Sequence, residues 1–163
     1  MSSKAPQRGG PINPGWLAIA VQVLIFLSRS DETCPSSRMA GQIGAHAVFL
    51  RRILALLARA NLVEAYEGRE GGYRLARPPA TITLAAVYHA LQAAGNEGLI
   101  PLEPARGPAL EPGLRLVFAE IGREFEETML TLLERYTLAD ILGRAEHLKG
   151  QAGEVADWSG NCT

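Results

Sequence analysis

The segment from Ser36 to Pro79 constrains the fold more than any other part of this chain. It starts with a short helical pattern, turns at Gly44, and continues in a second helical pattern that carries an apolar stripe. Alternating apolar and polar residues then predict two short strands on either side of a glycine-rich tip. Two helices across a glycine turn, followed by a two-stranded ribbon, predict a winged helix-turn-helix unit. The expected elements are helices at 37–42 and 46–60 and strands at 62–66 and 73–76.

The rest of the chain adds a buried helix, a linker and a long outlying helix, so we expect a mainly α protein with a small β-wing. A helical pattern at 16–29 is apolar on nearly every face, which is typical of a helix buried on most sides. Thr83 can cap a further amphipathic helix, and Thr137 can cap a short terminal one. The expected organisation is a flexible arm at 1–15, a winged helix-turn-helix domain at 16–94, a linker at 95–113, a dimerisation helix with the short terminal helix at 114–142, and a flexible tail at 143–163.

Charge is distributed unevenly along a chain whose formal net charge is only −1. Residues 38–77 contain seven arginines and three glutamates, a local charge of about +4. From residue 97 onward, twelve acidic side chains outnumber six basic ones. A near-neutral total can therefore hide a basic module that attracts nucleic-acid phosphates, although an unevenly charged solvated surface would look the same.

Two adjacent arginines are the main candidates for contact with DNA. Arg51 and Arg52 lie off the apolar stripe of the helix at 46–60, about 100° apart, so one can face a base edge and the other a phosphate. The arginine fork suits guanine, but two surface arginines in ion pairs are the alternative. His46, in the first turn of the same helix, is either a base contact or a surface histidine. The other candidate DNA-binding residues are Ser37, Arg38, Arg69 and Arg74.

The helix at 37–42 should begin with capping chemistry from Pro35 and the Ser36-Ser37 pair. Its unpaired amides at that end suit a phosphate, and Ser37 and Arg38 lie beside them.

The helical pattern at 114–136 carries a stripe of four-three spacing that Thr128 interrupts. A striped helix outside the compact domain indicates pairing with a second copy, because most oligomers are two-fold dimers. The alternative is an ordinary helix that packs within its own subunit. The expected dimerisation residues are Leu114, Phe118, Ile121, Phe125 and Leu132.

Several other kinds of site find no support in the sequence. Cys34 and Cys162 lie far apart without a Cys-x-x-Cys spacing, which argues against a disulfide scaffold or a zinc site. His89 and His147 are isolated, and no serine, histidine and acid combination indicates catalysis. The glycines at 68–72 link two strands, whereas a phosphate-binding glycine loop opens a helix. We therefore expect a protein that is not an enzyme and holds no cofactor.

An apolar run at 16–27 follows Lys4 and Arg8, as in a signal peptide. No small-residue cleavage site follows it, and the run is shorter than the roughly twenty residues that a bilayer requires. We expect a cytoplasmic protein whose first helix is buried.

Three separated stretches resemble the Rrf2-type winged-helix regulators, the bacterial family that includes IscR, NsrR and CymR. They are the wing Gly71-Gly72-Tyr73-Arg74-Leu75-Ala76-Arg77-Pro78; the helix start Ile82-Thr83-Leu84 with Val87 and Ala90-Leu91; and the closing Thr137-Leu138-Ala139-Asp140-Ile141-Leu142. The resemblance covers about residues 16–142. It implies a homodimer whose wings and recognition helices read a partly palindromic operator on double-stranded DNA.

The sequence departs from this family in two places. Several members sense iron–sulfur status, nitric oxide or redox state through three cysteines before the long helix, but residues 93–112 contain none. The chain is thus similar to members that lack the cluster. Cys34 is the remaining candidate for a thiol switch, by oxidation or by a bond to Cys162, and the alternative is an unreactive, partly buried thiol. The usual Arg-Gly-Pro-Gly-Gly-Gly wing tip is replaced by Glu67-Gly68-Arg69-Glu70-Gly71-Gly72. Two glutamates weaken the expected phosphate contact, which Arg69 partly restores.

These patterns predict a sequence-specific DNA-binding transcriptional regulator, expected to act as a repressor and as a homodimer. The alternative is a winged-helix module that binds proteins and does not grip DNA; the wing glutamates favour it. Salt dependence separates the two, because phosphate contacts release counterions. The effector, the operator and the regulated genes do not follow from these residues.

Overall fold

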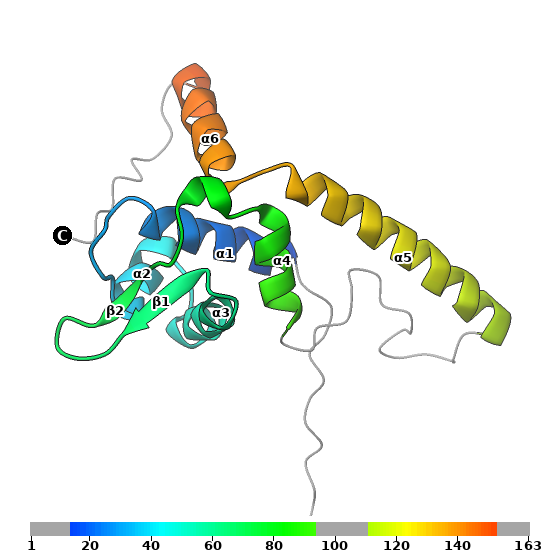
Figure 1. Ribbon diagram of the computed structural model, residues 1–163, viewed down its shortest axis with the longest axis horizontal. Coiled ribbons are helices and arrows are strands. Elements are labelled where there is room, and N and C mark those ends of the chain that lie inside the picture. The colour runs from blue at the N-terminus through cyan, green and yellow to red at the C-terminus, as the bar shows by residue number, and fades with distance from the viewer. Residues whose placement is uncertain (1–13, 94–110, 153–163) are drawn as a thin grey trace, which may run out of the picture.

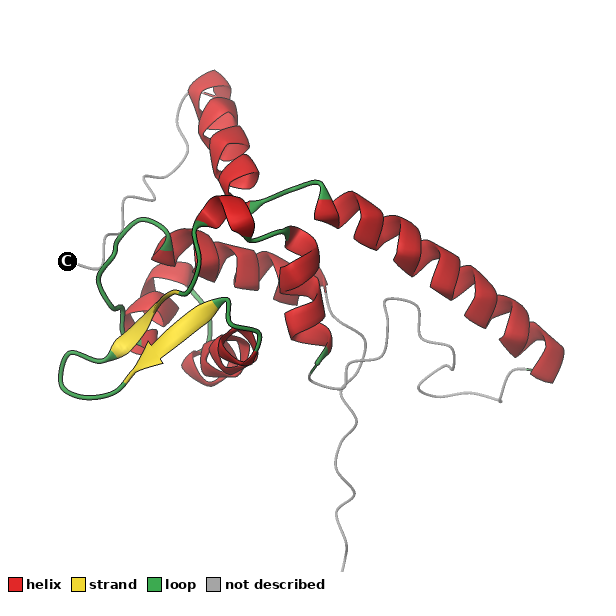
Figure 2. Cartoon of the chain, viewed as in Figure 1, coloured by secondary structure: helices red, strands yellow, loops and turns green. Residues whose placement is uncertain are grey.

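The computed structural model describes residues 14–93 and 111–152, and it consists of helices with one small antiparallel sheet (Figures 1 and 2). The elements in chain order are α1 (Pro14–Leu27), α2 (Ser36–Ile43), α3 (Ala47–Arg59), β1 (Val63–Tyr66), β2 (Gly72–Leu75), the 3-10 helix η1 (Pro79–Thr81), α4 (Leu84–Gln92), α5 (Pro112–Glu134) and α6 (Leu138–Ala152). The predicted mainly α fold with a β-wing is confirmed. Residues 1–13 of the predicted arm at 1–15, residues 94–110 with most of the linker, and residues 153–163 lie outside the described residues, and α1 begins at Pro14, inside the predicted arm.

Helix α1 forms the centre of the domain. It packs against α2, α3, α4, α6 and β2. Ala20, Val23 and Leu24 are completely buried, because an apolar helix loses the most water-exposed surface when neighbours cover several of its faces. The prediction of a first helix buried on most sides is confirmed.

Helices α2 and α3 form the helix-turn-helix. Gly44 ends α2 in the left-handed conformation (φ 71°), which glycine adopts without the steric penalty of a side chain. Across this turn the chain bends by 116°. Within the described ranges no single helix is long and apolar enough to cross a membrane, and α2 with α3 reach that length and apolar character only together, across the bend.

The predicted serine cap of α2 is wrong. Pro35 occupies the N-cap position and has no side chain that can accept a hydrogen bond, while Ser36 and Ser37 lie inside the first turn. A capping hydroxyl must come from the N-cap residue itself, so the two serines stand one and two positions too late.

The wing is the two-stranded sheet of β1 and β2, with Val63 opposite Leu75 and Glu64 opposite Arg74. The chain before α2 lies along the other edge of β2, where Cys34 and Tyr73 exchange two backbone hydrogen bonds of 2.9 Å. A Cβ atom on Gly72 would lie 2.6 Å from the Cys34 carbonyl. Glycine is therefore required where this segment crosses the wing.

The junction between α5 and α6 is hydrogen-bonded to the segment that leads into α4. The Leu84 amide donates to the Tyr136 carbonyl, and the Leu138 amide donates to the Ile82 carbonyl, both at 2.9 Å. Thr83 caps α4 as predicted, since its hydroxyl accepts from the Ala86 amide at 3.1 Å. From this joint α5 extends away from the domain (Figure 1).

The terminal helix is longer than predicted. It was expected to end at Leu142, but α6 continues to Ala152, so the prediction of a flexible tail needs correction over residues 143–152. Gly143 and Gly150 suggested an early end. The residues between them are mostly good helix formers, and isolated glycines cost a helix only about 1 kcal/mol each.

Candidate nucleic-acid interface

One side of α3 faces away from the domain, and it carries the two arginines that the sequence singled out. Leu50, Ile53 and Leu54 are completely buried on the opposite side. Arg51 and Arg52 are both exposed. The outward orientation expected from the apolar stripe is therefore observed, and α3 presents a basic face in the position of a recognition helix. The other exposed residues of this face are Val48, Ala55 and Arg59.

The two neighbouring arginines have different surroundings. The Nε of Arg51 donates to the Ala47 carbonyl of its own helix at 3.3 Å. The guanidinium of Arg52 lies over the indole of Trp16 in α1, with its Cζ 5.1 Å from the ring centroid. Trp16 in turn meets Phe49 edge to face, at 5.0 Å between centroids and 77° between planes. Trp16 was not among the predicted residues, because no local pattern in the sequence relates the start of α1 to α3.

The other helical candidates lie at the helix starts. Ser37 and Arg38 are exposed in the first turn of α2. His46 is the N-cap residue of α3, with an extended backbone and no side-chain cap bond, so it precedes the first turn where it was predicted. It is exposed, and it lies at the positive end of the helix dipole.

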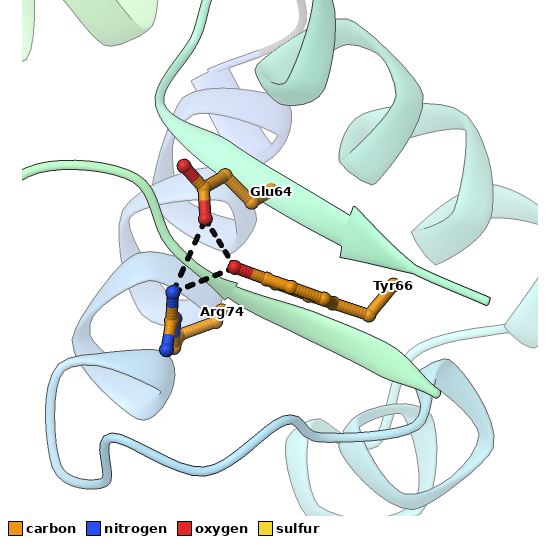
Figure 3. A network of polar contacts seen from close by, with 3 residues as sticks. All are labelled: Glu64, Tyr66 and Arg74. Carbon is orange, nitrogen blue, oxygen red and sulfur yellow. Dashed lines mark hydrogen bonds and ion pairs between the residues drawn. The ribbon is translucent and has the colours of Figure 1, made fainter. Parts of the chain in front are cut away.

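On the wing, Arg74 belongs to a three-residue network with Glu64 and Tyr66 (Figure 3). Its Nη2 donates to Glu64 Oε2 at 3.3 Å and to the Tyr66 hydroxyl oxygen at 2.6 Å. The Tyr66 hydroxyl donates to the same Glu64 oxygen at 2.5 Å. Glu64 and Arg74 are opposite each other in the register, and Tyr66 lies two residues along on the same face.

This network neutralises the charge of Arg74 and shifts the pKa values of its partners. The pKa of Glu64 falls below its ordinary value of 4.5, first because Tyr66 donates to it and then because Arg74 does. The pKa of Tyr66 rises above 10, chiefly because its proton is shared with Glu64. Arg74 is 43% exposed and uses one nitrogen here, so its remaining donors can still reach a phosphate. The alternation in the two predicted strands could have revealed this network.

At the wing tip, Arg69 is exposed, and so are Glu67 and Glu70, the two glutamates that differ from the usual tip sequence of the family. The Thr33 hydroxyl donates to the Glu70 carbonyl at 2.8 Å and so ties the tip to the segment before α2. Arg69 makes no ion pair among the described residues and is the free cation nearest the tip.

Cys34 lies directly before α2 and is completely buried. It is disulfide-bonded, and the only other cysteine of the chain, Cys162, lies outside the described residues. Because its backbone is bonded to Tyr73, Cys34 lies between the helix-turn-helix and the wing. A redox role for this residue stays a prediction.

Helix α5 has two distinct apolar faces. Met129, Leu130 and Leu133 pack against the core of the domain, and on the same side Gln92 of α4 donates to Glu126 at 2.5 Å. The predicted dimerisation residues lie about 100° further around the helix. They are between 41% and 49% exposed, although all are large and apolar: Leu114, Phe118, Ile121, Phe125 and Leu132.

The chain is similar to known transcriptional regulators over most of its length. Residues 16–144 match the Rrf2 family profile, described as an iron-dependent transcriptional regulator. The HTH-type transcriptional regulator NsrR of Geobacillus kaustophilus is 35% identical over 127 residues, which is 76% of this chain and 84% of NsrR. A protein of Mycobacterium tuberculosis named as a putative HTH-type transcriptional regulator is 31% identical over 144 residues, 86% of this chain and 84% of its own.

Solved structures share the fold. The structure of T. potens IscR aligns with a TM-score of 0.59 at 21% identity and covers 97% of this chain and 96% of its own. The structure of CymR, the global cysteine regulator of B. subtilis, aligns with a TM-score of 0.53 at 20% identity and covers 88% and 98%. At these identities the likeness establishes the winged-helix architecture.

Proposed function

The chain belongs to the Rrf2 family of transcriptional regulators, and from that premise we propose that it is a sequence-specific repressor that binds a partly palindromic operator as a homodimer. The members of this family are regulators and not enzymes. The observation that carries the proposal is the outward basic face of α3, set across a 116° bend from α2. A recognition helix in that position enters the major groove, and arginine there reads guanine. Such a regulator acts in the cytoplasm of a bacterium.

Phosphate contacts are expected from three places around α3. The first turn of α2 presents the exposed Ser37 and Arg38 at the positive end of the helix dipole. His46 stands at the start of α3, and Arg69 stands at the wing tip. Such contacts position the protein on the duplex and carry little sequence information.

The exposed stripe of α5 supports the homodimer. Five large apolar side chains follow one line on a helix that extends away from its own domain, and a second copy would remove them from water. The joint between Ile82 and Leu138 fixes where this helix leaves the domain. A dimer built on α5 would therefore hold two recognition helices at a set spacing, as a palindromic operator requires.

The donor set of the chain does not fit the iron–sulfur cluster of several family members. Such clusters are held mainly by cysteine thiolates, and this chain has two cysteines, of which Cys34 is buried and disulfide-bonded. The described residues contain no group of three or more His, Cys, Asp or Glu side chains that could hold a metal. We propose a regulator whose signal does not pass through a cluster.

The deciding experiment is operator binding after selection of bound sequences from a random duplex pool. Fluorescence anisotropy over a salt series should give a steep negative slope, because phosphate contacts release counterions. Of Arg51→Ala and Arg52→Ala, the change at a base-reading arginine should cost about 1–3 kcal/mol and relax one operator position. A phosphate-contacting arginine should instead weaken all sequences alike.

A protein-interaction module is the second candidate, because Glu64, Glu67 and Glu70 place negative charge on the wing. Binding that is absent or insensitive to salt would favour it. A double variant of Arg51 and Arg52 to Ala that binds the operator like the wild type would refute the proposed reading of α3.

A further inference from the structure

We propose that Trp16 is a positioning residue for DNA recognition: its indole fixes the direction of the Arg52 guanidinium before DNA arrives. This inference rests on the proposed DNA-binding function and deepens it. It concerns a residue of α1, outside the helix-turn-helix, that the sequence pattern did not indicate.

The indole of Trp16 is itself held in place. Phe49 meets it edge to face at 5.0 Å, and Phe49 packs against the core of the domain. Arg52 follows Phe49 by three residues, so both lie on the same side of α3, towards the start of α1. Because Phe49 and the core restrict its rotation, the indole of Trp16 is a fixed aromatic surface on which Arg52 stacks.

The stacking contact leaves the donors of Arg52 available. Its Cζ lies 5.1 Å from the indole centroid, within the range of a cation–π interaction. Among the described residues Arg52 forms no hydrogen bond and no ion pair. All five N–H groups therefore remain free to bind a base or a phosphate.

Arg51 differs from Arg52 in this respect. In the described part of the chain its only hydrogen bond, ion pair or ring contact is the 3.3 Å bond from Nε to the Ala47 carbonyl, within its own helix. No aromatic ring among residues 14–93 and 111–152 stacks on its guanidinium, so DNA binding must immobilise that group at the usual entropic cost. The neighbouring arginine is thus a matched control for the effect of stacking.

The expected effect on affinity is modest and specific. Because the contact is present before DNA arrives, the gain is the ordering of one long side chain that binding no longer has to supply, about two- to fivefold in affinity at the lower end of its usual cost. The loss should fall on the operator position that Arg52 reads, because a loosened fork discriminates less well between bases. Trp16→Ala should therefore relax the same position as Arg52→Ala and leave the others unchanged.

The test is a pair of double-mutant cycles on the selected operator. Trp16→Ala and Arg52→Ala, alone and combined, should show a coupling of about two- to fivefold. Trp16→Ala with Arg51→Ala should be additive. Trp16→Phe should retain much of the coupling, whereas Trp16→Leu keeps apolar volume without a π face and should lose it. If Trp16→Ala does not fold, the Phe and Leu variants complete the comparison.

Fluorescence provides a readout that needs no DNA. The chain has two tryptophans, so in a Trp158→Phe background Trp16 is the only tryptophan, and its emission can be excited selectively above the absorption of the four tyrosines. Arg52→Ala should change the emission of Trp16, and Arg51→Ala should leave it unchanged.

The outcomes separate the two claims. Additive behaviour in both cycles, or emission insensitive to Arg52→Ala, overturns the role of Trp16 while operator binding by the wild type upholds the proposed function. A wild type that selects no operator overturns both.

Discussion

The Glu64–Tyr66–Arg74 network makes a quantitative prediction about the wing. Glu64→Gln keeps a side chain of the same shape that can still accept a hydrogen bond, but it removes the charge that now neutralises Arg74. Because the pKa of Glu64 is lowered from 4.5, the carboxylate is ionised in any neutral assay, and the substitution changes the charge by one full unit. We expect the variant to bind the operator more tightly.

The size of the effect follows from counterion release. One released arginine that contacts a phosphate steepens the slope of log affinity against log salt by about 0.9. Between 50 and 200 mM salt, the advantage of Glu64→Gln over the wild type should thus shrink by about 3.5-fold. Anisotropy titrations across that range measure both the slope and the ratio.

A matched control lies on α5, where Glu127 pairs with Arg123 at 3.0 Å and both side chains are about two-thirds exposed. Glu127→Gln removes the same charge from the same kind of pair, but away from the wing, and should leave the salt slope unchanged. Equal slopes for Glu64→Gln and the wild type would refute the reasoning. So would an equal increase in the control.

Three further expectations concern assembly, acid stability and redox state. Ile121→Asp should give a monomer in sedimentation, because it buries an unpaired charge in the α5 seam, whereas Thr131→Asp on another exposed face should remain dimeric; a monomeric wild type would exclude the seam. Hydrogen bonds from Thr137 lower the pKa of Asp140, so the ionised carboxylate stabilises the start of α6 above about pH 3.8. Helicity by circular dichroism should therefore fall as the pH drops through the folded-state pKa, and it should fall less in Asp140→Asn. Superimposable titrations of the two proteins would contradict this. Operator affinity should differ between reducing and oxidising buffers in the wild type and not in Cys34→Ser; identical responses would rule out Cys34.

Much of the fold could be predicted because it depends on interactions between near neighbours in the chain. The turn at Gly44 needs a left-handed residue, and the stripe on α3 repeats with the period of the helix. The cap at Thr83 is decided by residues three positions apart. The prediction of a serine cap on α2 failed because α2 begins at Ser36, so that Pro35 and not a serine occupies the N-cap position.

The outward position of Arg51 and Arg52 was also a property of the sequence, since any residue off the apolar stripe of a packed helix must face solvent. The wing network lies between these cases. The network forms because Glu64 lies opposite Arg74 in the sheet. That pairing depends on the strand register, which is set by the length of the wing tip and by the burial of Val63.

Only the tertiary structure decided what distinguishes one arginine from the next. Arg51 and Arg52 are equivalent in the sequence, yet α1 crosses α3 so that Trp16 lies under one of them alone. The same holds for Gly72, which is required because the Cys34 segment crosses the wing there. Such contacts join residues about forty positions apart. They depend on how whole helices pack to bury their surfaces, and local periodicity in the sequence does not predict that packing.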